Sequence, residues 1–165
     1  MEPTLNVNDR VLVVKDKLIN MNYVIGDVIV FYNPNYVYNK NTYQEFYDSL
    51  QVWNLNKEQL TIDTAFIKRV IGIEDDVVEI TRDGKIYNNG ELINIDNVSG
   101  KRSTQEGTYI VAKNTIFVLG DNIENSIDSR IYGSINLDQV IGKAVFKIYP
   151  FKEFKSINDW KYNLE

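Results

Sequence analysis

The stretch FIKRVIG, residues 66–72, places Lys68 and Arg69 among apolar side chains. At the period of two expected for a strand, the two cations point to opposite faces, and each has apolar neighbours on its own face. Partial burial lowers the pKa of a lysine, because it penalises the charged form, and a lysine with a lowered pKa can act as a base. In the alternative interpretation, FIKRVIG is an edge strand whose two long side chains extend to water.

Neither histidine nor cysteine occurs among the 165 residues. Their absence excludes a Ser-His-Asp triad, a cysteine protease, thiol redox chemistry and a zinc site with the usual nitrogen and sulfur ligands. An acid–base enzyme working near neutral pH would have to use a lysine, a carboxylate, a tyrosine or a chain terminus as its base. Lys68 therefore becomes the leading candidate for a base, and we predict no metal and no cofactor.

The overall composition restricts the class of protein. A hydrophobic share of 44% and a charged share of 25% are those of an ordinary globular protein. The net charge of −5 does not provide the basic face that binds phosphates, so we predict no nucleic-acid partner. No apolar run approaches the roughly 20 residues needed to cross a bilayer.

Short runs rich in valine and isoleucine predict most of the elements that must position Lys68. Asp83-Gly84 and Asn89-Gly90 are strong hairpin signals and predict two successive tight turns within residues 76–93. The pattern predicts a mostly β fold and a single domain over residues 1–165, with loop and helix excursions between strands. Further strands are predicted at 10–15, 27–32, 66–73, 108–112, 116–122 and 140–150.

Residues 33–65 differ from their surroundings because they are polar and rich in tyrosine. Phe46, Leu50 and Trp53 fall at helical spacing, so the middle of this segment could form a helix. We interpret it as an excursion between core strands whose aromatic side chains form a small satellite core rather than a ligand site.

Four stretches occur along the chain in the order MEPTLNVNDRVLVVK, GDVIVF, FIKRVIGIEDDVVEI and IFVLGDNIENSIDSRIYG. Together they resemble the conserved boxes of the type I signal peptidases, the membrane-bound Ser-Lys proteases that release exported proteins. One box alone would be weak, because a Gly-Asp or GDN turn is common. The pattern GDN-x-x-NS-x-DSR-x-x-G is intact over residues 120–133, and the resemblance extends from Met1 to about Phe151, apart from the excursion.

The resemblance implies a complex of short antiparallel β-sheets, and it assigns roles by position. Lys68 matches the general base, a lysine held neutral by an apolar setting so that it can accept a serine proton. Ser126 matches the serine whose hydroxyl orients that lysine. The pocket for the residue before the cleaved bond matches Met1, Pro3, Leu5, Phe66 and Ile67.

The same resemblance assigns structural support around the dyad. One matched pair ties the lysine strand to the GDN turn, and a second pair supports the following turn. As an isolated feature, the second pair would be interpreted as an exposed ion pair of little energetic value. These supporting residues are Arg69 with Asp121, Asp128 with Arg130, and Gly120 and Asn122 of the turn.

The chain also departs from the family pattern. The family's nucleophilic serine immediately precedes the methionine that matches Met1, and the oxyanion residue and membrane anchor lie further upstream. We therefore expect the chain as given to be inactive, either as a truncation or as a natural homologue that has lost catalysis. Smaller departures are Asn8 for a glycine, Ile123 for an arginine, and Glu74-Asp75 for Pro-Gly.

The expected partners are signal peptides of exported proteins and the extracytoplasmic surface of the membrane. Apolar side chains near the groove mouth, such as Leu5 and Val7, are expected to face the bilayer. One alternative is a non-catalytic homologue that binds or assembles exported proteins. Another is a self-cleaving repressor, although the DNA-binding module and cleavable linker of such a protein are absent from this sequence.

Overall fold

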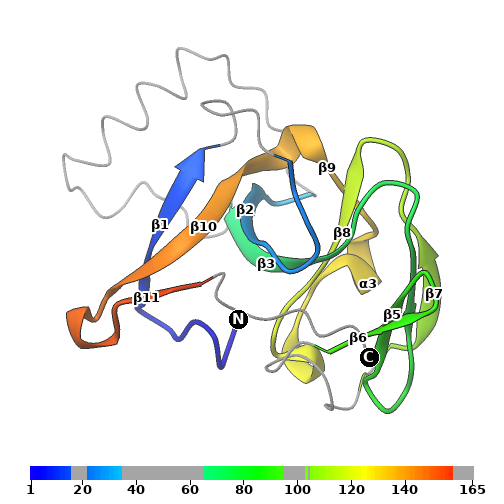
Figure 1. Ribbon diagram of the computed structural model, residues 1–165, viewed down its shortest axis with the longest axis horizontal. Helices are drawn as coiled ribbons and strands as arrows, with labels where there is room; N and C mark the ends of the chain where they lie inside the picture. The colour runs from blue at the N-terminus through cyan, green and yellow to red at the C-terminus, as the bar shows by residue number, and fades with distance from the viewer. Residues whose placement is uncertain (16–21, 35–64, 95–102, 104, 158–165) are drawn as a thin grey trace.

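The structure is a computed structural model, and it describes residues 1–15, 22–34, 65–94, 103 and 105–157. Most of the excursion predicted at 33–65, including its helical pattern, lies outside these residues. The single-domain boundary at 1–165 therefore stays a prediction. Within the described residues the fold is mostly β, with two antiparallel sheets, as predicted (Figure 1).

Most of the larger sheet is formed by the valine- and isoleucine-rich runs that the sequence predicts as strands. Its two-residue strands at Ile135–Asn136 and Lys155–Ser156 were not predicted. Its strand order is β1-β10-β2-β3-β8-β9, and β11 pairs with β10. All the pairings in it are antiparallel. The strands are β1 (Arg10–Lys15), β2 (Val28–Tyr32), β3 (Ala65–Gly72), β8 (Thr115–Leu119), β9 (Ile135–Asn136), β10 (Val140–Tyr149) and β11 (Lys155–Ser156).

The smaller sheet has the order β6-β5-β4-β7 and contains both predicted hairpins. Between β5 and β6, Asn89 and Gly90 have φ of 51° and 84°, which is the left-handed conformation that a two-residue turn of this type requires. Gly84, in the turn between β4 and β5, has φ of 81°. The strands are β4 (Val77–Ile80), β5 (Ile86–Asn88), β6 (Glu91–Ile93) and β7 (Gly107–Ile110).

The helices of the described residues are short. Asp128 caps helix α3 (Ser129–Tyr132) by accepting a hydrogen bond from the Arg130 backbone nitrogen. The 3₁₀ helices are η2 (Ile123–Asn125), η3 (Leu137–Gln139) and η4 (Phe151–Glu153).

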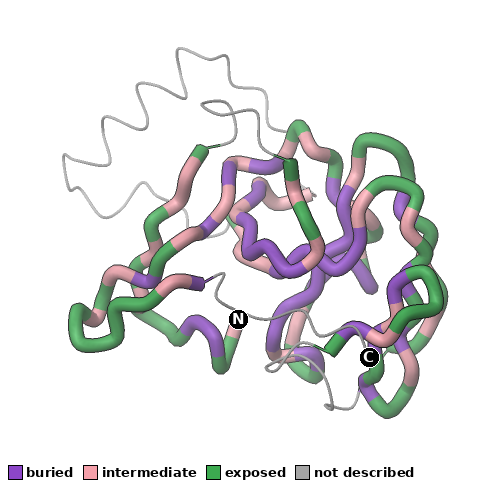
Figure 2. The backbone as a smooth tube through the Cα atoms, in the orientation of Figure 1, coloured by how far each residue is buried: buried purple, intermediate pink, exposed green. Residues whose placement is uncertain are grey.

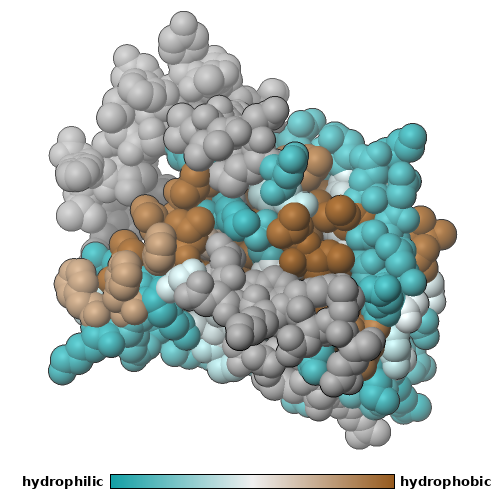
Figure 3. All heavy atoms as spheres, viewed as in Figure 1, coloured by the Kyte–Doolittle hydropathy of each residue, from teal (hydrophilic) through white to brown (hydrophobic). Residues whose placement is uncertain are grey.

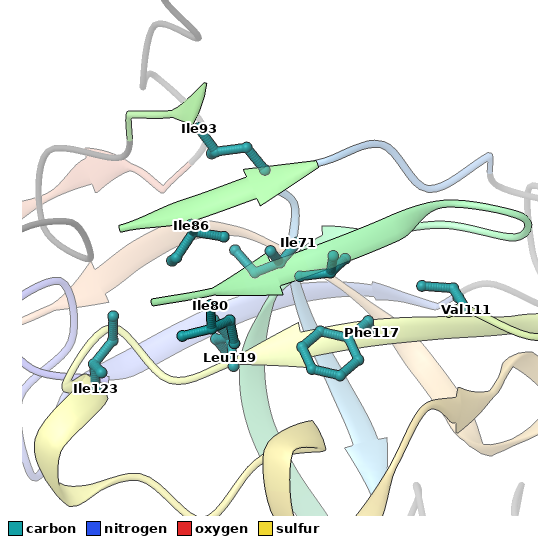
Figure 4. Packing of buried hydrophobic residues seen from close by; sticks show 9 residues of the cluster. Ile71, Ile80, Ile86, Ile93, Val111, Phe117, Leu119 and Ile123 are labelled. Carbon is teal, nitrogen blue, oxygen red and sulfur yellow. The ribbon is translucent and has the colours of Figure 1, made fainter. Parts of the chain in front are cut away.

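Three apolar clusters stabilise the sheets, and Figure 2 shows burial concentrated along the central strands. The first cluster joins the two sheets, with Ile71 of β3 and Leu119 of β8 packed against Ile80 and Ile86 of the smaller sheet (Figure 4). The second surrounds Phe31, and the third includes Leu5 from the N-terminal segment. Burial of this apolar area is the main favourable contribution to folding.

Strand β3 has different neighbours along its length. It pairs with β2 from Ala65 to Arg69, but with β8 only from Arg69 to Gly72. The chain leaves β8 at Leu119 and enters the GDN turn, so this turn lies beside the lysine half of β3. The fold thus brings residues 58 positions apart within reach of each other at Lys68.

Candidate active site

Lys68 and Ser126 form a direct hydrogen bond. The Lys68 Nζ donates to the Ser126 Oγ over 2.9 Å, and both residues are partly buried. The lysine therefore does not extend freely to water, as an edge-strand side chain would. This is the arrangement that the predicted roles of base and orienting serine require.

The setting of Lys68 lowers its pKa below the ordinary lysine value. Burial is the largest cause, because it removes water from the charged ammonium group. The carboxylates of Asp128 and Asp121 act in the opposite direction, and the nearby charge of Arg130 lowers the pKa further. Lys68 therefore reaches the neutral form needed for proton transfer at a lower pH than an exposed lysine does.

Gly120 allows the turn to approach the dyad closely. A Cβ atom at this position would lie 2.1 Å from the Ser126 Oγ and 3.2 Å from the Lys68 Nζ. Any larger residue would therefore occupy the space of the serine hydroxyl. This close packing explains why position 120 holds a glycine, the residue that the family resemblance implies there.

Arg69 and Asp121 form a buried clamp. The Arg69 Nε and Nη2 donate to the two carboxylate oxygens over 2.9 and 2.8 Å, and the Nη1 donates to the Gly26 carbonyl over 2.9 Å. The Thr4 hydroxyl donates to the same carboxylate. The clamp therefore joins β3, the GDN turn and the N-terminal segment.

Asp128 and Arg130 form a second buried pair, rather than an exposed one. The Arg130 Nε and Nη2 donate to the Asp128 oxygens over 2.8 and 2.9 Å. The Asp128 Oδ2 accepts from the Gly120 backbone nitrogen over 3.1 Å, and the Arg130 Nη2 donates to the carbonyls of Ile123 and Ser126 over 2.8 and 3.3 Å. The pair thereby holds both ends of the loop that carries Ser126.

A pocket of about 410 Å³ opens at the N-terminal segment, and its lining includes Ile67 and Asn125, the residues that precede Lys68 and Ser126 in the sequence. Met1, Leu5 and Ile67, three of the predicted substrate-binding residues, line it together with Asn122 of the turn. The other two predicted residues are placed elsewhere. Phe66 packs edge-to-face on Phe31, with ring centroids 6.1 Å apart, and Pro3 is exposed outside the pocket lining.

The Met1 nitrogen lies in the electrostatic field of Lys68. Burial, followed by the positive charge of Lys68, lowers the pKa of the Met1 amine. Met1 also accepts a hydrogen bond at its carbonyl from the Leu5 nitrogen over 3.0 Å. The charges of Lys68 and of the Met1 amine therefore influence each other.

The fold accommodates the residues at which the chain departs from the family pattern. Asn8 and Asp75 stand where the resemblance implies glycine, and their φ values are 72° and 68°. Asparagine and aspartate tolerate this left-handed region better than other non-glycine residues. Ile123, which replaces an arginine, is fully buried in the cluster between the two sheets.

Sequence reasoning missed three polar residues that support the site. Thr4 binds Asp121, and Ser103 accepts a hydrogen bond from the Arg130 Nη1 over 3.1 Å. Ser129 accepts one from the Val118 nitrogen over 3.0 Å. No local pattern identifies such residues, although Thr4 and Ser129 lie inside the matched boxes. In the part of the chain that the structure describes, no three metal-binding side chains gather into a site.

The sequence pattern of the family described as "Signal peptidase, peptidase S26" matches residues 1–149. The chain belongs to this signal peptidase family. The dyad, the two buried pairs and the pocket all lie within the matched residues. Among the described residues, no helix has the length and apolar composition that crossing a membrane requires.

Similar proteins support this membership of the signal peptidase family. The chain is 29% identical to "Probable signal peptidase I-2" of Synechocystis sp., over 96% of this chain and 63% of that protein. It is 31% identical to "Signal peptidase I" of Leptolyngbya laminosa, over 91% and 64%. It is 32% identical to "Thylakoidal processing peptidase 1, chloroplastic" of Arabidopsis thaliana, over 91% and 39%. The chain thus spans less than two thirds of each of these relatives.

A solved structure shares the signal peptidase fold. The crystal structure of a signal peptidase I from Enterococcus faecalis V583 is 26% identical to this chain. The match covers 74% of this chain and 97% of that one, with a TM-score of 0.50. The mostly β fold with two antiparallel sheets is therefore one that signal peptidase I also has.

Proposed function

We propose that this chain supplies the base, the orienting serine and the substrate pocket of a signal peptidase that removes N-terminal signal peptides from exported proteins. The observation that carries the proposal is the hydrogen bond between Lys68 and Ser126, formed by a lysine whose pKa is lowered by burial. The pocket lined by Met1, Leu5 and Ile67 provides a place for the substrate residue that precedes the cut.

The nucleophile in this proposal is a serine joined directly to Met1, at the position that the family resemblance implies. The effect of the Lys68 charge on the Met1 amine, whose pKa it lowers, supports it. Neutral Lys68 takes the hydroxyl proton as the serine oxygen attacks the peptide carbonyl, and returns it to the amine that leaves when the C–N bond breaks. Water then hydrolyses the resulting ester.

The proposed substrate is an extended segment with small side chains near the cut, in an A-x-A-like pattern. Such a segment would add as a strand beside the N-terminal segment and the half of β3, Ala65–Lys68, that lies beyond the β8 pairing. Backbone hydrogen bonds would supply affinity, and the pocket at Met1, Leu5 and Ile67 would select a small side chain.

We propose the extracytoplasmic face of the membrane as the location, with a membrane anchor upstream of Met1. Val7 is 81% exposed, which supports its expected contact with the bilayer. Leu5 is buried and cannot contribute to a bilayer-facing surface. A larger set of exposed apolar side chains gathers over β1, β10 and η4 (Figure 3). This surface, here called the aromatic patch, consists of Leu12, Phe146, Tyr149, Phe151 and Phe154.

The direct test is cleavage of a purified preprotein in detergent by the chain extended upstream with the serine and the oxyanion residue. We expect cleavage by the extended chain and none by a chain that starts at Met1, because loss of a protease's serine costs about a millionfold in rate. Lys68→Ala should lower the rate by at least about 10²- to 10⁴-fold, the usual contribution of a general base.

Two further variants separate the roles within the dyad. Lys68→Arg should be as inactive as Lys68→Ala, since a guanidinium group does not lose its proton in this pH range. Ser126→Ala should cause a smaller loss by releasing the orientation of the amine. Full activity of Lys68→Ala would rule out the Ser-Lys mechanism. Tight peptide binding without cleavage by the extended chain would instead favour a non-catalytic binding or assembly factor.

A further inference from the structure

Lys147 of β10 is a buried cation that the family resemblance does not assign. It is 1% exposed, whereas its neighbour Phe146 is 37% exposed. A strand on the surface of a globular protein normally buries its aromatic residue and exposes its lysine. The inverted order leaves Lys147 covered by neighbouring side chains instead of exposed to water, and a charge in such a position is normally paired.

The ammonium of Lys147 binds two carboxylates from different segments. Its Nζ lies 2.7 Å from the Asp9 Oδ2, and it also donates to Glu153 of η4. Hydrogen bonds with Asp9 and with Glu153 raise the pKa of Lys147, so the lysine remains charged across the physiological range. The Asp9 side chain is 7% exposed, so the Lys147–Asp9 pair is shielded from water.

The same Asp9 oxygen closes a tight turn. The Asp9 Oδ2 accepts a hydrogen bond from the Asn6 nitrogen over 2.8 Å, and the Asp9 nitrogen donates to the Asn6 carbonyl over 3.1 Å. Asn8 adopts its left-handed conformation within this turn. Lys147 therefore holds the Asn6–Asp9 turn through the oxygen that shapes it.

This turn is a wall of the substrate pocket. Asn6, Val7 and Asp9 all line the pocket, and seven of its ten lining residues lie between Met1 and Val11. The clamp of Arg69 and Asp121 anchors the N-terminal segment at Thr4, whereas Lys147 anchors it at Asp9. The position of the wall relative to Ile67, which also lines the pocket, depends on both anchors.

We propose that Lys147 is a positioning residue that sets the width of the substrate pocket, and thereby its selectivity for a small side chain before the cut. The proposal rests on the proposed function, because it takes this pocket as the site for that side chain. Without the ammonium, the buried carboxylate of Asp9 would lose its counter-ion and turn toward water, and the Asn6–Asp9 wall would move with it.

The test measures binding of two synthetic signal peptides to the full chain by fluorescence anisotropy. One peptide carries A-x-A before the cleavage point, and the other has valine in place of the last alanine. For Lys147→Met we expect the preference for alanine over valine to fall about tenfold, through loss of alanine binding and gain of valine binding. Lys147→Arg, which keeps the charge, should restore most of the preference.

Lys143 provides a matched control on the same strand. It also forms an ion pair, with Asp27, and neither residue lines the pocket. Lys143→Met should lower the thermal unfolding temperature and leave the ratio of the two affinities unchanged. Should Lys147→Met fail to fold, Asp9→Asn removes the same ion pair at nearly constant volume and is expected to lose the same preference.

Each outcome bears on one of the two proposals. An unchanged affinity ratio in both Lys147→Met and Asp9→Asn, or an equal loss in Lys143→Met, would overturn the positioning role and leave the proposed function standing. Failure of the unaltered chain to bind either peptide would refute the proposed function, and the role of Lys147 with it.

Discussion

At the scale of single residues, the properties of Lys68 depend on competition between burial and charge. Burial and the cation of Arg130 lower its pKa, whereas the anions of Asp128 and Asp121 raise it. The net direction is downward from the ordinary value of 10.5. Each unit of such a shift corresponds to about 1.4 kcal/mol of preference for the neutral amine.

The shift predicts a rising pH profile for the serine-extended chain. Only the neutral amine accepts the serine proton, so kcat/KM should increase as the pH rises and Lys68 deprotonates. Because the pKa is lowered, the midpoint should lie below 10.5. The measurement is kcat/KM on a signal-peptide substrate across the pH range in which the chain stays folded. A profile that falls with pH over this range would contradict the assignment of Lys68 as the base.

At the scale of elements, two buried ion pairs align the strand and the turns at the site. The Arg69–Asp121 clamp links β3 to the GDN turn, and the Asp128–Arg130 pair links that turn to α3. Buried pairs often contribute little net stability, because desolvation offsets their attraction. Their value here is geometric, since they place Ser126 against Lys68.

Removing one partner of the clamp should be strongly destabilising. Asp121→Ala takes away the carboxylate that neutralises Arg69, which is 2% exposed, and we expect a loss of about 3–5 kcal/mol in the free energy of unfolding. The measurement is urea denaturation. Asp83→Ala is the control, because the Asp83–Lys85 pair is exposed and screened by water, so its loss should change the free energy of unfolding far less than the loss of Asp121. A similar small effect for both variants would show that the clamp is not energetically important.

At the scale of the whole molecule, the aromatic patch and the pocket lie at the same end of the larger sheet. Both include residues of β1. Lys147 connects them, because it pairs with Asp9 of the pocket wall and with Glu153, which lies in the sequence between Phe151 and Phe154 of the patch. Phe146 stacks on Phe154 with ring centroids 5.6 Å apart, and Phe151 is 82% exposed. Exposed apolar side chains that gather in this way are typical of interaction surfaces.

The patch predicts binding to lipid vesicles. Replacing both Phe151 and Phe154 by serine should weaken binding to vesicles with anionic lipid about tenfold or more, because a buried phenylalanine contributes roughly 1.5–3 kcal/mol. Co-sedimentation measures the change. Ile110→Ser is the control, since Ile110 is 76% exposed but lies on β7 of the smaller sheet. Equal binding by the double variant and the unaltered chain would exclude the patch as the lipid contact.

The sequence alone determined the β class, most strand positions, both hairpins and the pairing of Lys68 with Ser126. These follow from local signals or from the order of the family boxes. The valine- and isoleucine-rich runs set the strands, because their side chains favour a pleated, buried surface. Asn89-Gly90 set a turn, because both positions need φ above zero. Local chemistry was sufficient for the strands and turns, whereas the pairing of Lys68 with Ser126 came from the family resemblance.

Only the tertiary structure decided which polar side chains are buried together. Thr4 and Asp121 are 117 positions apart, and nothing local in either stretch indicates their hydrogen bond. In the sequence, Lys147 resembles an ordinary surface lysine. Phe66 was expected, from the family resemblance, to line the substrate pocket. Packing placed the first inside against Asp9 and the second on Phe31. The physical reason is that the cost of burying a charge depends on the groups around it, and these groups come from distant strands.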